Sequence, residues 1–442
     1  MADPAANLRA AASWPDGPIE REAVTRALRR LARQDVATAA SQWESLAARF
    51  SFAAGERSSV LHDIALQAAA SYRPDAGRWF QQVPEEARSE SLMEWELRAA
   101  LAVRDWGGVL ALVRGLSPEL ASAARSRYWQ ARALEETGAN DDARALFAGL
   151  ATEANFHGFL AADRLDAPYA ICPEEIPAEP ARLAALRGNG ELARALELRA
   201  IGWQAHASRA WEHARRSASE TDRRQMLLVA SEEGWHDRAI YALNTGGDLR
   251  QYALRFPVAE RDTVIRESSA NGLDPAWTYA LIRAESAWQP DARSGANAYG
   301  LMQLLPGTGQ QMARQLGIPW SGTRMLLDPQ ANIRLGTRYL SQQAARFGGS
   351  PWLASAAYNA GPAAVQRWLD ARHALPADVF IETIPYRETR EYVMRVMAFS
   401  VIYDWRLSGK AHPLSARLPA PGSPWAPRDR GSPRTVTCPL PG

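Results

Sequence analysis

A repeat of 34 residues in the amino-terminal third restricts the possible folds of this chain more than any other feature. The run WELRAALAVRDWGGVLALV from Trp95 aligns with WQARALEETGANDDARALF from Trp129, and Ala65, Ala99 and Ala133 keep the same spacing. Apolar residues recur at helical spacing from about residue 20 to residue 165, with short breaks. The period predicts stacked pairs of antiparallel helices whose small Ala positions allow close packing.

Thirty-four residues is the period of tetratricopeptide repeats, so we expect an α-superhelical, tetratricopeptide-like domain over residues 1–166. The alternative is an Ala-rich helical bundle whose periodicity is accidental. Four prolines in DAPYAICPEEIPAEP, from Asp166, interrupt the helical pattern and indicate a boundary. We expect a helical linker domain over 167–256, a further domain over 257–411, and an irregular or disordered Pro/Gly-rich tail over 412–442.

Length and charge limit the kinds of function. A chain of 442 residues is expected to form two or three domains. Its 51 Lys and Arg nearly balance its 49 Asp and Glu, which leaves no basic field for nucleic acid. No stretch approaches the roughly 20 apolar residues of a transmembrane segment, and no export signal is recognisable. A cytoplasmic protein, or a sequence that begins after its signal, would both explain this pattern.

The two cysteines, Cys172 and Cys438, lie far apart in the sequence. Neither the close spacing of a zinc site nor that of a redox motif is present. A disulfide between them is an option that the sequence leaves open.

A carboxyl group at the end of a helix is the first candidate for chemistry. Asp274-Pro275 is typical of a helix start, with a capping side chain followed by Pro in the first turn. In the run AWTYALIRAES that follows, Trp277 and Leu281 mark one face, and Glu285 falls on or beside it. Apolar surroundings raise the pKa of a carboxyl group, so that it can donate a proton near neutral pH. The alternative for a lone Glu here is a solvated helix end.

Two segments of small residues carry side chains suited to binding a ligand. The loop SGANAYGLMQ, from Ser294 to Gln303, allows close backbone approach and ends on an amide that both donates and accepts. In AYNAGP, the Gly-Pro pair stops a helix and places Tyr358 and Asn359 beside a turn.

Four runs together resemble the four motifs of the soluble lytic transglycosylases in order and spacing: ESAW from Glu285, GLMQ from Gly300, AYNAG from Ala357 and IETIPYRETREYV from Ile381. The resemblance is close over roughly residues 256–405 and loose over the helical amino-terminal half. It implies a mainly all-α chain, with an α-superhelical helix-repeat region followed by a lysozyme-like catalytic domain and room for a small β-hairpin.

One position departs from the family pattern. A Gly is usual where this chain has Asn297, two residues before Tyr299. Asn is the non-Gly residue that best tolerates positive φ, so we expect the loop turn to persist.

The resemblance implies a peptidoglycan lytic transglycosylase, a carbon–oxygen lyase. Such an enzyme cuts the β-1,4 bond between N-acetylmuramic acid and N-acetylglucosamine without water and leaves 1,6-anhydromuramic acid ends. Glu285 matches the family's single catalytic acid/base. The residues implied in substrate binding are Ser286, Ser294, Met302, Gln303, Tyr358, Asn359 and Glu382. No metal or organic cofactor is implied, and the expected compartment is the periplasm.

Two other functions stay open at this stage. A hydrolytic muramidase needs a second acid across the bond, for which Asp291, Glu382 and Glu388 are candidates. A helical-repeat adaptor with an inactive lysozyme-like domain would predict loss of Glu285 or its neighbours. The partners expected are peptidoglycan glycan strands, with cell-wall proteins as further candidates for the superhelical surface.

Overall fold

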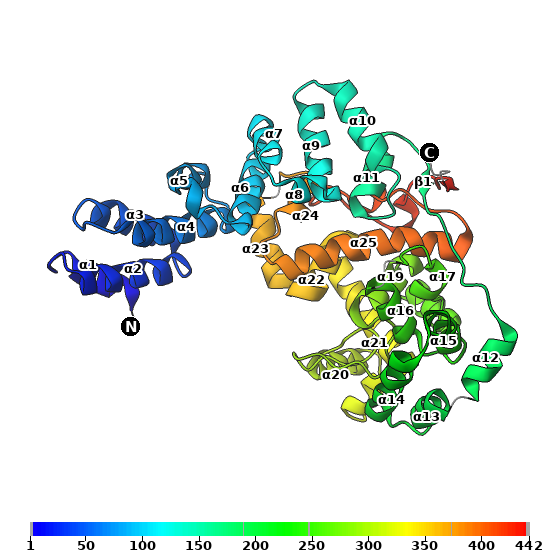
Figure 1. Cartoon of the computed structure of the whole chain (residues 1–442). Helices are drawn as coiled ribbons and strands as arrows, with labels where there is room; N and C mark the ends of the chain where they lie inside the picture. Colours follow the sequence, from blue (N-terminus) through cyan, green and yellow to red (C-terminus); the bar gives the residue numbers. More distant parts are fainter. Residues whose placement is uncertain (1–2, 189, 246–247, 373, 439–442) are drawn as a thin grey trace. The chain divides into compact units, whose positions relative to one another are not determined.

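The computed structural model describes residues 3–188, 190–245, 248–372 and 374–438 (Figure 1). The described residues are mainly helical, which confirms the predicted fold class, and they form two compact units. The first unit contains residues 1–150 and 363–391, and the second contains residues 151–362 and 392–442. Because residues 363–391 group with the amino-terminal helices, the units do not follow sequence order, and the division into three sequential domains and a tail stays a prediction. Among the described helices, none is long and apolar enough to cross a membrane.

The first unit is built from helical hairpins that follow the predicted repeat. Helices α6 and α9 begin 34 residues apart, at Glu90 and Ala124, and α7 and α10 keep the same spacing. Its helices are α1 (Pro4–Ala11), α2 (Pro18–Ala32), α3 (Val36–Ala47), α4 (Ala54–Ala70), α5 (Ala76–Gln82), η1 (Glu85–Ala87), α6 (Glu90–Ala102), α7 (Trp106–Arg114), α8 (Pro118–Ser122), α9 (Ala124–Glu136), α10 (Asn140–Leu150), α23 (Pro362–Arg372) and α24 (Ala377–Glu382). Helix α25 (Arg387–Ser408) begins in this unit and continues into the second.

Whereas the fourth predicted motif, residues 381–393, belongs to the first unit up to Glu391, the second unit contains the first three motifs. Its remaining elements are α11 (Phe156–Arg164), β1 (Tyr169–Ala170), α12 (Pro180–Arg187), α13 (Gly190–Ala200), α14 (Gln204–Ser217), α15 (Glu220–Glu232), α16 (His236–Thr245), α17 (Tyr252–Arg255), α18 (Arg261–Ala270), α19 (Pro275–Ser286), α20 (Pro306–Gln315), η2 (Thr323–Leu327), α21 (Pro329–Arg346), α22 (Pro351–Ala360), η3 (Ser415–Arg417), η4 (Pro427–Asp429) and β2 (Val436–Thr437).

Strand structure is minimal. Strands β1 and β2 pair in parallel, with Tyr169 opposite Val436. Isolated antiparallel bridges join Tyr299 to Arg293 and to Leu304. The small β-hairpin that the resemblance allowed is therefore reduced, in the described part of the chain, to these two bridges.

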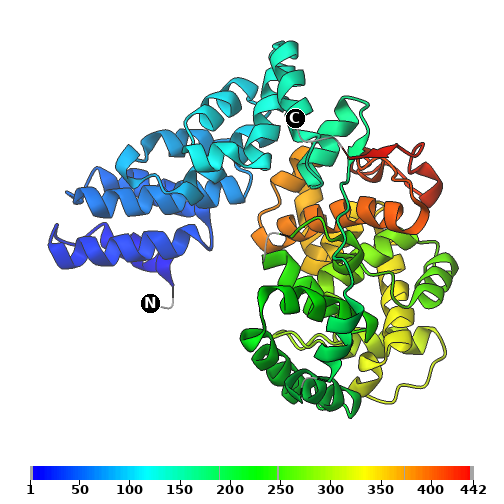
Figure 2. The ribbon, with the colours of Figure 1, turned by 45° about the vertical axis from the view of Figure 1, so that its right-hand side comes forward.

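The carboxyl-terminal segment, for which irregular or disordered structure was expected, is irregular but held by specific contacts. It lies beside the end of α25 (Figure 2, red). A disulfide joins Cys172 to Cys438, which answers the question that the sequence left open. The guanidinium of Arg434 pairs with Asp163 at 2.8 Å, and the hydroxyl of Tyr169 donates to that carboxylate at 2.7 Å.

A buried ionic cluster connects this segment to the start of α19. Arg417, which has no exposed surface, lies 2.6 Å from Asp274 Oδ2 and 2.8 Å from Asp404 Oδ2. Arg430 reaches the other oxygen of Asp274 at 3.1 Å. The same Oδ1 accepts a hydrogen bond from the backbone of Ala276, so Asp274 caps α19 as the sequence predicted. Two cations from the tail thus compensate the charge of this buried cap.

Candidate active site

Glu285 lies in the last turn of α19, half-buried, as its position in the helical pattern predicted. Trp277 and Leu281, on the same face, are 1% and 0% exposed. The indole of Trp277 donates to the hydroxyl of Ser355 on α22 at 3.0 Å. This bond attaches the helix that carries Glu285 to the helix that carries Tyr358.

The backbone turns sharply directly after Glu285. Ala287 and Trp288 both have positive φ, 51° and 65°, which is unusual for two consecutive residues with a Cβ atom. Buried Ser286 stabilises the turn, because its hydroxyl donates to Ile282 O and accepts from the backbone N–H of Trp288, both at 3.2 Å. Ser286, which the resemblance implied in substrate binding, therefore closes the end of α19 in this structure.

Tyr392 makes the most direct contact with the candidate acid. Its hydroxyl donates to Glu285 Oε1 at 2.6 Å, and its side chain is almost completely buried. Burial, and then the negative charge of Glu285, raise the pKa of Tyr392 well above its usual range. The phenol is therefore neutral and able to donate near neutral pH. The sequence placed Tyr392 in the fourth motif but gave no reason to expect this contact.

Tyr358, expected near the glutamate, lies within its electrostatic influence. Burial, followed by the charge of Glu285, raises the pKa of Tyr358 well above its usual value. The neutral hydroxyl donates to the backbone carbonyl of Met302 at 2.7 Å, and the ring contacts Tyr339 with centroids 5.1 Å apart. Asn359 follows at the end of α22, half-buried, and Gly361 terminates the helix with a φ of 83°, as predicted.

The loop of the second motif folds back on itself. Gln303 has a φ of 47°, and its amide donates to Ala292 O at 3.1 Å and to Gly300 O at 2.9 Å. Ser294, half-buried, accepts a hydrogen bond from the backbone of Ala298 at 3.0 Å. Asn297 adopts a φ of 65°, so the expected positive-φ turn persists without Gly.

Asn332, on α21, holds this loop in place and was not identified from the sequence. Fully buried, it accepts a hydrogen bond from the backbone N–H of Met302 at 2.7 Å. Its amide donates to Tyr299 O at 3.0 Å and to Leu326 O at 2.8 Å. One side chain thus bonds three backbone groups, although Tyr299 O also accepts from the backbone N–H of Leu304 at 3.0 Å. The Asn-Ile pair after Pro329 offered no local signal, because its partners are up to 33 residues away.

Gly300 makes the close approach possible. A Cβ atom there would lie 2.0 Å from Leu326 O and 2.3 Å from the amide nitrogen of Asn332. Its φ of +78° is also one that side chains rarely adopt. Only Gly fits this position, as the small-residue pattern of the loop indicated.

Glu382, expected beside the reacting sugar, belongs to the first unit and has no exposed surface. It accepts hydrogen bonds from Arg98 at 3.2 Å, from Arg125 at 2.9 Å and from the indole of Trp129 at 3.2 Å. Burial alone would raise its pKa, but the charges of Arg125 and Arg98 outweigh it and lower the pKa to about 2. Glu382 is therefore an ionised, internally paired residue rather than an exposed charge.

The described contacts bring together Glu285, Tyr358, Tyr392 and the loop of Met302 and Gln303. Of the candidates for a second acid, half-exposed Asp291 lies in the second unit and accepts from Gln289 at 3.2 Å. Glu388 is exposed and lies in the first unit. This arrangement offers one positioned carboxyl group with two neutral phenols close to it.

Three stretches of the chain match models of one protein family. Residues 262–381 match the transglycosylase SLT domain, residues 383–411 the soluble lytic transglycosylase helical domain, and residues 185–248 the soluble lytic murein transglycosylase L domain.

Curated relatives carry the corresponding name. The soluble lytic murein transglycosylase of Escherichia coli strain K12 is 32% identical over 344 residues, which cover 77% of this chain and 53% of that protein. The Salmonella typhimurium protein of the same name is 33% identical over 328 residues, which cover 74% of this chain and 50% of that protein. The chain thus spans about half the length of the curated relatives that it matches.

Solved structures also resemble this chain, and these matches cover a larger share of its length. An inactive mutant of the lytic transglycosylase Slt from Pseudomonas aeruginosa has a TM-score of 0.86 and 37% identity, covering 93% of this chain and 67% of that one. The 70 kDa soluble lytic transglycosylase from Escherichia coli has a TM-score of 0.80 and 29% identity, covering 96% and 68%. Its complex with bulgecin A gives a TM-score of 0.83.

Proposed function

This chain belongs to the soluble lytic transglycosylase family, as its four motifs predicted, and we propose that it cleaves the glycan strands of peptidoglycan. The bond cut is the β-1,4 bond between N-acetylmuramic acid and N-acetylglucosamine, and the product ends in 1,6-anhydromuramic acid. The hydrogen bond from Tyr392 to Glu285 supports this proposal most directly. It holds one carboxyl group close to two phenols, those of Tyr392 and Tyr358.

In the proposed reaction Glu285 performs both proton transfers. It first protonates the glycosidic oxygen, while the substrate's own acetamido group stabilises the positive centre at C1. The resulting carboxylate then takes the proton of the muramic acid C6 hydroxyl, whose oxygen attacks C1. One carboxyl group is enough because the nucleophile is part of the substrate, whereas most glycoside hydrolases place two carboxyl groups across the bond.

The neighbouring residues have positioning roles in this proposal. Tyr392 donates to one oxygen of Glu285 and orients the carboxyl group for proton transfer. Tyr358, neutral and close to the charge of Glu285, stabilises the region of the acetamido group. Gln303 and Asn359 orient the saccharide by hydrogen bonds. Ser294 and Met302 belong to the loop that positions Gln303.

Two residues act indirectly in the proposal. Ser286 closes the helix end beneath Glu285 through its bonds to Ile282 and Trp288. Glu382 holds α24 to α6 and α9 through Arg98, Arg125 and Trp129, and a contact with the saccharide is not part of the proposal because its side chain is fully enclosed.

We place the reaction in the periplasm. Disulfides such as Cys172–Cys438 persist in oxidising compartments, including the bacterial periplasm, and are rare in the cytosol. The helix-repeat domain remains the proposed surface for cell-wall protein partners.

The test is mass spectrometry of muropeptides released from purified peptidoglycan by the wild-type chain and by Glu285→Gln. Ends in 1,6-anhydromuramic acid that disappear with Glu285→Gln are the expected result. Reducing muramic acid ends would contradict the proposal and favour hydrolysis. The variants Asp291→Asn and Glu388→Gln would then test which residue is the second acid. If the wild-type chain releases nothing, an adaptor function replaces catalysis.

A further inference from the structure

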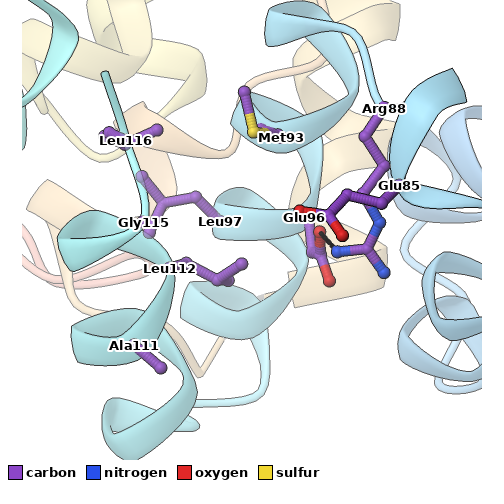
Figure 3. Close-up of a pocket in the computed structure, with 9 residues that line it drawn as sticks. All are labelled: Glu85, Arg88, Met93, Glu96, Leu97, Ala111, Leu112, Gly115 and Leu116. Atoms are coloured by element: carbon purple, nitrogen blue, oxygen red, sulfur yellow. Dashed lines mark hydrogen bonds and ion pairs between the residues drawn. The ribbon is translucent and has the colours of Figure 1, made fainter.

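The first unit contains a cavity of about 640 Å³ between α6, α7 and the segment before α6 (Figure 3). Its volume lies within the range of small-ligand sites. The lining residues are Glu85, Arg88, Met93, Glu96, Leu97, Ala111, Leu112, Gly115 and Leu116. Figure 3 shows the charged side chains gathered at one end and the leucines at the other. The cavity therefore has one polar end and one apolar end.

A second cavity of about 280 Å³ continues it. Glu96, Ala111 and Leu112 belong to the walls of both cavities, so the two lie side by side along α5, α6 and α7. Small residues of these helices line the second part: Ala76, Gly77, Ala99, Ala100, Gly108 and Ala111. Such walls permit close approach of a second backbone. We call the two cavities together the α5–α7 groove.

The charges of the α5–α7 groove are unequally compensated. Arg88 donates to the carbonyls of Phe80 and Val83, and its approach to Glu96 is only 3.5 Å. Arg73 is held by both oxygens of Asp75 at 2.8 Å. The two cations are thus committed to groups of their own unit.

The carboxylates that line the groove have weaker compensation by opposite charges than its two guanidinium groups have. The side chain of Glu96 is 18% exposed. Burial raises the pKa of Glu96, and this effect outweighs the lowering by the positive charge of Arg88. Glu85 adds a second carboxylate at the same end, while Asp105, in the second cavity, caps α7 through Gly108 N. Glu96 therefore pairs with Arg88 only at 3.5 Å, and Arg88 also donates to two backbone carbonyls.

We propose that the α5–α7 groove binds an extended peptide segment of a partner protein, with a lysine-type ammonium group against Glu96 and Glu85. The small and apolar side chains that flank this lysine contact Leu97, Leu112 and the Ala walls. The larger cavity has no aromatic ring among its lining residues, which disfavours stacking on a sugar. Glu96 belongs to the first unit and Glu285 to the second, and the proposed peptide binding requires no residue of the proposed cleavage reaction.

The experiment titrates three blocked pentapeptides, Ala-Leu-X-Ala-Ala with X as Lys, norleucine or Glu, into the full chain by calorimetry. We expect the Lys peptide to bind with a Kd on the order of 0.1–1 mM and the norleucine peptide at least about fivefold more weakly. Glu96→Gln should reduce the affinity for the Lys peptide to that of the norleucine peptide. Ala111→Trp, which fills both cavities, should abolish binding of both peptides.

The matched control is Glu119→Gln, an exposed glutamate on α8 outside the groove, which should bind like the wild type. Muropeptide release by Glu96→Gln at the wild-type rate separates this proposal from the proposed enzymatic function. Equal affinity for the Lys and norleucine peptides, unchanged binding by Glu96→Gln, or the absence of saturable binding at about 5 mM peptide would overturn the proposal. Competition by an N-acetylglucosamine oligomer would point to a glycan site instead.

Discussion

Tyr392 donates its phenolic hydrogen to Glu285 Oε1 across 2.6 Å, although the two residues lie 107 positions apart. Glu285 lies in the last turn of α19 and Tyr392 in the second turn of α25, so the carboxyl group is held by an element other than its own. Hydrogen bonds to an ionised carboxylate are roughly twice as strong as neutral ones. This contact therefore helps to fix the orientation of the Glu285 carboxyl group.

Tyr392→Phe removes this donor and keeps the ring. A hydrogen bond to a charged group contributes about 1.5–3 kcal/mol, so we expect release of 1,6-anhydro products to slow by roughly 10- to 100-fold. Tyr386→Phe is the control, because Tyr386 is half exposed and contacts Trp368 only through its ring. Initial rates on purified peptidoglycan measure both variants. An unchanged rate for Tyr392→Phe would remove Tyr392 from the proposed machinery.

Two glycines of the same loop should respond differently to an added methyl group. Gly300→Ala places Cβ 2.0 Å from Leu326 O at a φ of +78°, so we expect a loss of at least about 2 kcal/mol in the free energy of unfolding and little residual activity. Gly295→Ala meets no atom within 4 Å and should change the free energy by less than about 0.5 kcal/mol. Thermal unfolding and activity assays compare them, and equal losses would contradict the close approach at Gly300.

Asn332 should act on activity through the loop that carries Gln303. Asn332→Ala removes the side chain that bonds Met302 N and Leu326 O, at a cost of about 1–3 kcal/mol for each buried group, while Tyr299 O keeps its bond from Leu304 N. If the residue works by positioning the loop, Asn332→Ala and Gln303→Ala should be non-additive in kcat/KM by more than about 0.5 kcal/mol. Additive effects would show that Asn332 contributes to the stability of the fold and not to the position of Gln303. A Gln303→Ala variant with wild-type activity would instead question the proposed role of Gln303.

The ionised state of Glu382 predicts a pH dependence of stability. Its folded pKa of about 2 lies below the ordinary 4.5, so its contribution is present above pH 4.5 and is lost as pH falls toward 2. At pH 7, Glu382→Gln leaves Arg98 and Arg125 without their carboxylate, and we expect it to cost about 3–5 kcal/mol. Denaturant unfolding at pH 7, 4.5 and 3 should show the difference from wild type shrinking at the lowest pH. Glu388→Gln, at an exposed site, is the control, and a difference that does not vary with pH would contradict the low pKa.

The features that the sequence predicted correctly are local ones. The 34-residue helix repeat, the cap at Asp274, the positive φ of Asn297 and the helix stop at Gly361 all follow from residue type and spacing. Each is determined by groups within a few residues, which periodicity and turn chemistry describe well.

The features that the sequence did not predict depend on distant partners. Glu382 meets Arg98 across 284 positions, and Cys172 meets Cys438 across 266. Asn332 and Tyr392 resemble ordinary helical residues until the packing brings the second motif and Glu285 to them. Helical spacing shows which face of a helix is buried, but not which element covers that face.

The buried pair of Asp274 and Arg417 affects how the chain can be divided. A fragment limited to residues 262–381, or extended to residue 411, contains Asp274 but neither Arg417 nor Arg430. The carboxylate of Asp274 would then be buried without a compensating cation, or the region around it would open to water. In either case the first turn of α19, the helix that carries Glu285, would be less stable. Shortening the chain at its carboxyl end therefore removes the two cations that pair with the cap of α19, the helix that carries Glu285.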